Sequence, residues 1–188
     1  MIEKPHLRYH FFKLIVCVIL TVVVFIFREQ LVHLNHLKFF IGALMVAYGL
    51  DEIAFEAYCH KLHFIHEHKT YLGLIELVLG IATLALSLDY EAVCIIWATW
   101  SIVRESYEIK ELVTEIKSIT LTVVSGVESI AVIVLSIMLI AEPGEHHALI
   151  HIYLLLVELV LNPLIPLADE IIEKKKLKLK EKKAQKEE

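Results

Sequence analysis

Apolar residues come in six blocks along the chain, and each block is about as long as a bilayer is thick. The blocks cover residues 11–27, 37–58, 71–88, 92–112, 119–141 and 148–172. A helix needs about 20 mainly apolar residues to cross the hydrocarbon core. The blocks lack the two-residue alternation of strands, and an open sheet in lipid would leave its backbone groups unpaired. The pattern therefore predicts an all-α, polytopic membrane protein with six transmembrane helices.

The connections between the blocks are short at one end of the predicted bundle. Residues 89–91 join the third and fourth blocks, and residues 142–147 join the fifth and sixth, with a Pro143-Gly144 turn. Glutamates also recur at a fixed period in the even-numbered blocks, at Glu52, Glu105 and Glu158. Such a period fits an array of repeated units. We therefore expect three tight helical hairpins, which pair the first block with the second, the third with the fourth and the fifth with the sixth.

The composition supports a membrane protein and excludes several other classes. Of the 188 residues, 57% are hydrophobic, and the mean hydropathy is +0.66. A soluble domain has about 45–50% apolar residues. This excludes a disulfide-rich secreted scaffold, a disordered protein and an ordinary cytosolic enzyme. The three cysteines form no Cys-x-x-Cys pair, which favours a role as apolar packing residues over a redox or metal-binding role. The chain has no phosphate-binding glycine loop, Gly-x-Ser-x-Gly or His-Glu-x-x-His motif, which argues against ATP-driven transport by this chain alone.

Basic residues predict the orientation in the membrane. Of the 18 lysines and arginines, 15 lie in the N-terminal segment, the second and fourth connections, and the tail. Because basic loops stay on the cytoplasmic side, both termini should face the cytoplasm of a multi-pass inner-membrane protein. We expect residues 1–172 to form the transmembrane bundle and residues 173–188 a polybasic cytoplasmic tail. Such a tail is attracted to anionic lipids, which accounts for it without nucleic acid as a partner.

Short stretches of the sequence resemble a family. They are Ile41-Gly42-Ala43-Leu44 with Gly49, Ser125-Gly126-Val127-Glu128-Ser129-Ile130 with the Pro143 turn, and Val157-Glu158-Leu159. Together with three membrane hairpins in under 200 residues and two cytoplasmic termini, they are similar to the HdeD-like acid-resistance membrane proteins. The resemblance implies a role in stress or acid tolerance. It implies no catalytic residue, and this chain carries many more charges within its spans.

Charged side chains lie inside the predicted spans, and this is the main functional signal. They are Asp51, Glu52, Glu56, Glu76, Arg104, Glu105, Glu108, Glu128 and Glu158. Each charge costs about 2.5–3.5 kcal/mol at the bilayer centre. Eight unpaired acids on lipid-facing surfaces would therefore exceed the roughly 5–15 kcal/mol stability of a typical domain. Helical spacing turns most of these residues inward. We expect Glu76, Glu128 and Glu158 to form a proton or cation cluster, with Arg104 as the internal counter-charge.

A more specific form of the cation-cluster hypothesis is a site for a metal ion. Glu52, Glu56 and His60 are spaced by one helical turn each, and Glu105 and Glu108 also share a face. Carboxylate-bridged dimetal bundles use a Glu-x-x-His pair, and none lies within a span. A divalent cation held by oxygen ligands stays possible as a cofactor or substrate. The alternatives are a divalent cation transporter or channel, a membrane metalloenzyme, and a scaffold in which all acids are paired or protonated.

Histidines gather near both faces of the predicted membrane. His146, His147 and His151 lie at the outer end, where we consider them candidate pH sensors because histidine titrates between about pH 5 and 8. Exposed histidines without any coupling are the alternative. Small residues such as Gly42, Gly49, Gly73 and Gly80 permit close helix contacts. These contacts fit one chain or a homo-oligomer equally well.

Overall fold

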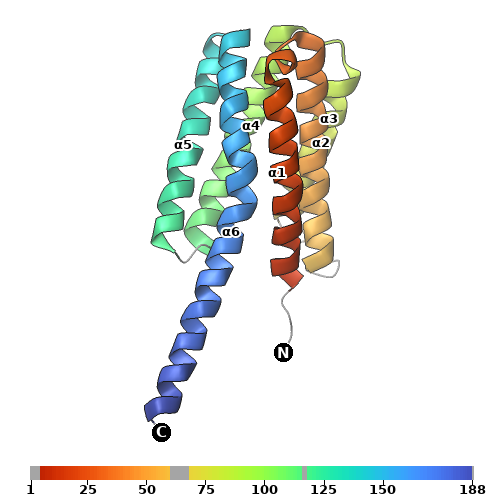
Figure 1. The fold of residues 1–188 in the computed structure, drawn as a ribbon. Coiled ribbons are helices and arrows are strands. Elements are labelled where there is room, and N and C mark those ends of the chain that lie inside the picture. Colours follow the sequence, from red (N-terminus) through yellow and green to blue (C-terminus); the bar gives the residue numbers. More distant parts are fainter. Residues whose placement is uncertain (1–4, 60–67, 116–117, 188) are drawn as a thin grey trace.

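The protein is a bundle of six long helices in a computed structural model, which describes residues 5–59, 68–115 and 118–187 (Figure 1). The helices are α1 (Pro5–Leu31), α2 (Leu34–Cys59), α3 (His68–Ala85), α4 (Tyr90–Glu115), α5 (Ile119–Ala141) and α6 (Glu145–Glu187). No strand occurs within these ranges. The all-α prediction is therefore confirmed, and the order of helices follows the order of the apolar blocks.

Three helices are long and apolar enough to cross a membrane. Their spans are Tyr9–Leu31, Ile119–Ala141 and Glu145–Lys176. The apolar part of α3, Tyr71–Ala85, is shorter. Acidic and basic side chains interrupt the apolar runs of α2 and α4. The outer surface nevertheless has the character of a lipid-facing one, because many large apolar side chains are exposed.

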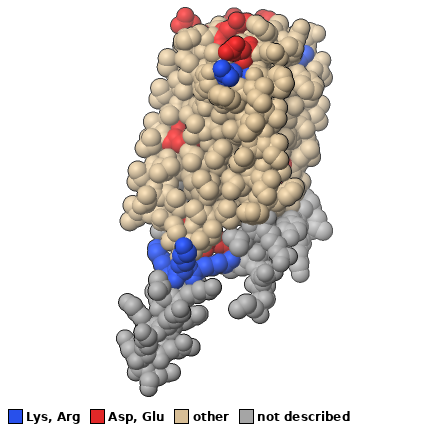
Figure 2. Space-filling model, in the orientation of Figure 1, with Lys and Arg blue, Asp and Glu red and all other residues tan. Residues whose placement is uncertain are grey.

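This apolar surface forms a belt around the bundle. Phe12 and Ile26 on α1, Val78 on α3 and Val127 on α5 are each more than 60% exposed. Figure 2 shows a broad band with few charged side chains, whereas basic and acidic side chains gather mainly at its two ends. A soluble monomer rarely exposes an apolar patch of more than a few hundred Å². The belt is therefore best explained by contact with lipid.

The short turns lie at the end of the bundle away from the two termini (Figure 1). At one of them Asp89 caps α4, because its Oδ1 accepts a hydrogen bond of 2.8 Å from the backbone N–H of Ala92. An acceptor at this position satisfies one of the unpaired donors of the first helical turn. The opposite end of the bundle holds the start of α1 and the long C-terminal extension of α6.

The packing of the helices differs from the three predicted hairpins. The most extensive contacts are between α2 and α3, between α4 and α5, and between α1 and α6. The outer turns are as short as expected, but α3 and α4 are not among the well-packed pairs. The reason lies in the side chains: small residues face each other across α2 and α3, whereas a short turn fixes only the ends of two helices.

Glycines bring the α2 and α3 backbones together. A Cβ atom on Gly49 would lie 2.5 Å from the carbonyl oxygen of Gly73, and one on Gly80 would lie 2.7 Å from the carbonyl oxygen of Gly42. Small residues allow membrane helices to approach closely and gain van der Waals contact. The four glycines named from the sequence therefore form a contact within one chain.

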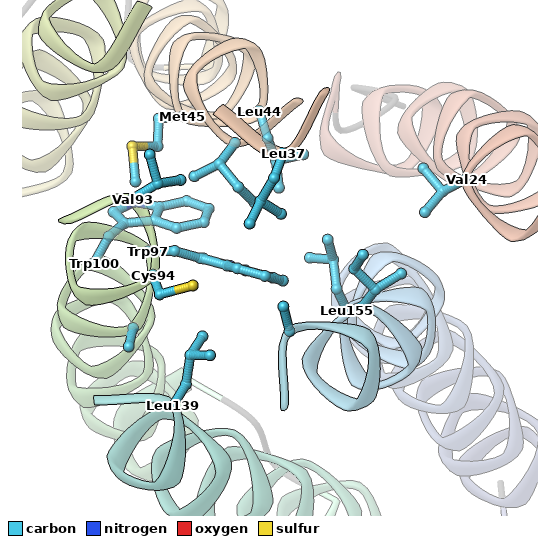
Figure 3. Close-up of a cluster of buried hydrophobic side chains, with 14 of the residues drawn as sticks. Val24, Leu37, Leu44, Met45, Val93, Cys94, Trp97, Trp100, Leu139 and Leu155 are labelled. Atoms are coloured by element: carbon cyan, nitrogen blue, oxygen red, sulfur yellow. The ribbon is translucent and has the colours of Figure 1, made fainter. Parts of the chain in front are cut away.

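A core of apolar side chains fills the half of the bundle that lies away from the two termini. Figure 3 shows Trp97 and Trp100 of α4 pointing toward Leu37 and Met45 of α2 and toward Leu155 of α6. Each of these five residues is at most 5% exposed. The core packs the helices around α4 and thereby fixes the position of the charged residues one or two turns further along that helix.

The last helix runs beyond the bundle. Helix α6 has 43 residues, which corresponds to about 65 Å at 1.5 Å per residue. It continues through Pro163 and Pro166, and it also crosses residue 172, the expected boundary of the tail. Its extension and the beginning of α1 lie at the same end of the bundle (Figure 1). Lys174, Lys175 and Lys176 are exposed near the point where α6 leaves the bundle.

Candidate functional site

Arg104 lies at the centre of a buried charge cluster. Its Nη1 is 3.2 Å from Glu76 Oε1 on α3, and its Nη2 is 3.0 Å from Glu108 Oε1 one turn along α4. Its Nε lies 3.6 Å from Glu158 Oε1 on α6. The guanidinium carbon is 3.6 Å from the centroid of the Tyr48 ring on α2. One side chain, only 4% exposed, thus joins four helices.

Glu76 is fully buried and is held by two donors. Its Oε1 accepts hydrogen bonds from Trp100 Nε1, at 3.0 Å, and from Arg104 Nη1. Trp100 and Arg104 are four residues apart on α4, so both point from the same face toward α3. Oε2 of Glu76 has no hydrogen-bond partner among the described residues. Glu76 is therefore a fixed partner of Arg104 rather than a free ligand.

Glu105 of α4 and Glu128 of α5 form the part of the cluster where these two helices meet. Glu105 is 0% exposed and Glu128 is 9% exposed. Both oxygens of Glu105, Oε1 of Glu128 and the hydroxyl of the buried Ser129 make no hydrogen bond of ordinary geometry with a described residue. A buried polar group without a partner costs about 1–3 kcal/mol, and more when it is charged. The carboxylates in this part of the cluster therefore have too few hydrogen-bond donors among the described residues.

Three carboxylates come close enough to share one cation. Glu105, Glu108 and Glu158 each offer an oxygen, and the three oxygens lie within 4.8 Å of one another. Asn162 Nδ2 donates a hydrogen bond of 2.9 Å to Glu108 Oε1. Oxygen ligands of this kind suit hard divalent cations. The described residues contain no other group of this kind.

The structure places the predicted metal residues in different positions. Glu105 and Glu108 come together, but their third partner is Glu158, which the sequence had suggested for the proton cluster. Glu52 is not in this group; it is half-buried where α2 meets Gly73 of α3. The side chain of Glu56 and all of His60 lie outside the described residues.

Another acid named from the sequence is neutralised elsewhere. Lys13 Nζ on α1 lies 2.6 Å from Asp51 Oδ2 on α2, and the Tyr9 hydroxyl donates a hydrogen bond to the same carboxylate. Asp51 thereby ties α1 to α2 and takes no part in the cluster around Arg104.

The charges around Arg104 do not balance. Five carboxylates surround one guanidinium, and four of these five are at most 9% exposed. If all five were ionised, four negative charges would be in excess. The desolvation cost of an isolated buried ion is several kcal/mol even after relaxation. The cluster therefore holds more acidic groups than its one buried guanidinium can neutralise.

The outer histidines divide into two groups. His146 is exposed, and the half-buried His147 donates from Nδ1 to the carbonyl oxygen of Glu142 at 3.0 Å. Their rings are 5.6 Å apart. At the same end His33 Nδ1 lies 3.2 Å from Glu145 Oε1. His33, His146 and His147 are thus all at least partly exposed at this end of the bundle.

His151, in contrast, is buried inside the bundle, although it belongs to the same end of α6. It is 2% exposed, its Nε2 lies 3.0 Å from Ser136 Oγ on α5, and its ring stacks on Trp97 at 4.5 Å. The cause is the helix period: one turn beyond His147, the same face of α6 has passed from the rim into the bundle.

Sequence reasoning missed two partners of the buried groups. Tyr48 is four residues from Glu52 and so shares a face of α2 with it, but nothing in that spacing indicates a contact with Arg104. Ser136 was not singled out, although a signal existed. It follows Ser129 by seven residues, which is two helical turns, so both hydroxyl side chains lie on one face of α5.

Comparisons of the chain with protein-family models, with curated proteins and with solved structures gave no match. The resemblance to HdeD-like proteins therefore rests on the short motifs and on the architecture expected from the sequence.

Proposed function

We propose that this chain is a multi-pass membrane protein with six membrane-spanning helices, whose buried carboxylates take up protons or a cation. The observation that carries this proposal is the excess of carboxylates over positive charge around Arg104. The many exposed apolar side chains on the outside of the bundle support a location in a membrane. Three helices are apolar enough to span alone, and the charged residues of α2 and α4 are mostly turned toward neighbouring helices.

The proposed orientation places the termini in the cytoplasm of an inner membrane. The basic residues at the terminal end of the bundle support it, since such residues mark the cytoplasmic side. Exposed Lys174, Lys175 and Lys176 would then meet anionic lipid headgroups, each contributing about 1 kcal/mol. A role in acid tolerance would follow from proton uptake and rests on the resemblance to HdeD-like proteins.

A second candidate is a transporter or channel for a divalent cation. The observation in its favour is the approach of Glu105, Glu108 and Glu158 to within 4.8 Å. Glu108 is 24% exposed, so the cluster has one carboxylate that water can reach. Asn162, which donates to Glu108, would hold this carboxylate in place during exchange.

The test compares proton uptake and metal content in detergent-purified protein kept free of chelator. A pH indicator dye follows proton uptake on a jump from about pH 8 to pH 6, a window above the ordinary range of exposed glutamates near pH 4. We expect Glu105→Gln and Glu128→Gln each to take up about one proton fewer per chain, and Glu105→Gln to lose any bound metal found by elemental analysis. Glu142→Gln, an exposed acid outside the cluster, is the matched control.

The two candidates give different results. Metal at about one equivalent, lost in Glu105→Gln and Glu158→Gln, would favour the divalent cation. Proton uptake without metal would favour the proton site. If both cluster variants match the parent in proton uptake and in metal content, the acids are a structural network and the proposal is wrong.

A further inference from the structure

Polar side chains recur along the contact between α4, α5 and α6 at the spacing of helical turns. Each of these helices carries a series in which neighbouring members are three or four residues apart. The series are Trp97, Ser101, Glu105 and Glu108 on α4; Ser136, Val132, Ser129 and Ser125 on α5; and His151, Leu155, Glu158 and Asn162 on α6. Residues so spaced lie on one face of a helix. Each series runs from the outer half of the bundle toward the end that holds the termini.

Contacts between the helices align these series in levels. At the outer level Trp97 stacks on His151, which pairs with Ser136. Two turns further, Glu105 and Glu158 approach each other, and Ser129 lies beside Glu105. These two levels are about 10 Å apart, which is the rise of seven helical residues.

One level separates His151 from the carboxylates. It contains Ser101, Val132 and Leu155, which are 6%, 1% and 2% exposed. Ser101 supplies the hydroxyl group of this level, and it is four residues from both Trp97 and Glu105 on α4. Two of its three side chains are apolar and all three are buried, so this level would hinder hydrated ions while Ser101 supplies one hydroxyl group.

His151 has the chemistry of a relay at this position. Its Nε2 is paired with Ser136, whereas its Nδ1 makes no hydrogen bond with a described residue. One turn outward on the same helix, half-buried His147 reaches the rim of the bundle. Imidazole can accept a proton on one nitrogen and release one from the other.

The surroundings of His151 argue against a metal ligand. Residues 132–141 of α5 carry no titratable side chain, and the first turns of α4 carry Tyr90, Cys94 and the exposed Glu91. On α6 the titratable groups within two turns of His151 are His147, Glu158 and the exposed Glu145, His146 and Tyr153, and the Tyr153 hydroxyl accepts a hydrogen bond from Arg28 on α1. Among the described residues, no metal-binding group of three ligands includes His151.

We propose that His151 relays protons between the outer surface at His147 and the carboxylate level of Glu105 and Glu158. The proposal rests on the proposed function, because it needs a cluster that takes up protons. A proton adds to Nδ1 of neutral His151 and gives the imidazolium. Nε2 then gives its proton to Ser136 Oγ, whose own proton passes by way of the Ser101 hydroxyl to a carboxylate oxygen of Glu105. At His151 one N–H bond has then formed and one has broken, each hydroxyl has exchanged its proton, and the carboxylate has become a carboxylic acid.

The experiment measures proton flux in proteoliposomes that contain a pH-sensitive dye and an imposed pH difference. His151→Phe keeps an aromatic ring on Trp97, and His151→Gln keeps a hydrogen-bonding side chain beside Ser136. We expect flux to fall at least tenfold in both variants. His146→Phe, at the exposed outer surface, should keep the parental rate. Elution at the parental volume in size-exclusion chromatography selects variants that are folded, and Ser136→Ala provides a smaller change in the same pair.

Each outcome has a definite meaning. If the parent takes up protons in detergent but conducts none in vesicles, the relay is wrong and the proposed function stands. If His151→Phe or His151→Gln conducts at the parental rate, the relay is wrong as well. If the parent neither takes up protons in detergent nor conducts them, the relay and the proton form of the proposed function fail together.

Discussion

The guanidinium carbon of Arg104 lies 3.6 Å from the centroid of the Tyr48 ring, across the contact between α4 and α2. The ring covers a cation that three carboxylates also approach, from α3, from α4 and from α6. A cation over an aromatic face gains more when it is removed from water. Arg104 is therefore both the counter-charge of the cluster and a link between helices that are far apart in the sequence.

We expect Arg104→Met to lower the free energy of unfolding by about 3–5 kcal/mol, because it leaves buried carboxylates without their counter-charge. Denaturant unfolding in detergent, followed by circular dichroism, measures the change. Arg28→Met is the control, since Arg28 is a rim residue and should change stability by less than about 1 kcal/mol. The double variant Arg104→Met with Glu76→Gln should lose less free energy of unfolding than the two single variants lose together. Equal losses in Arg104→Met and Arg28→Met would contradict this role.

Gly49→Ala and Gly80→Ala should each destabilise the protein by about 1–3 kcal/mol, since the new methyl group meets backbone atoms of the neighbouring helix. Helix propensity alone predicts the opposite sign, a gain of about 1 kcal/mol. The sign of the change therefore tests the close contact of α2 and α3. Gly144→Ala is the control, because the nearest atom would be 4.0 Å away. Thermal unfolding of the three variants in one detergent gives the comparison.

Glu105→Gln and Glu158→Gln should affect stability differently. Glu105 has no hydrogen-bond partner of ordinary geometry among the described residues, so a neutral amide should leave the free energy of unfolding unchanged or raise it. Glu158 lies 3.6 Å from Arg104, and its loss should cost about 1.5–3 kcal/mol. Unfolding at several cation concentrations measures both variants. Similar losses in both would indicate that Glu105 has a partner, such as a bound cation, in the folded protein.

Cysteine labelling tests the proposed orientation. In a chain with Cys17, Cys59 and Cys94 changed to alanine, Glu145→Cys should react with an impermeant maleimide from outside the cell. Lys175→Cys should react only after the membrane is opened. Both positions are exposed, and they lie at opposite ends of the bundle. Glu29→Cys, another exposed outer position, should behave as Glu145→Cys does. Reaction of both ends from the same side would exclude the six-span arrangement.

The sequence alone determined which segments are helical and which residues are chemically unusual. Long apolar runs leave few options other than helices, because backbone groups in lipid must pair within the segment. The same logic singled out Arg104 and the glutamates, since a charge in an apolar run needs a partner. The helical period also indicated that these residues point inward. Each of these features is local, and local features can be read along one chain.

The tertiary structure decided which residues meet. The pairing of α2 with α3, rather than of α3 with α4, follows from glycines that fit against each other in three dimensions. The approach of Glu158 to Glu105 and Glu108 depends on how α6 crosses α4. The same packing buries His151 against Trp97 and Ser136, where the sequence indicated only a position near one end of the last helix. A helical period fixes the face of a residue, but only the packing of side chains from other helices fixes what that face touches.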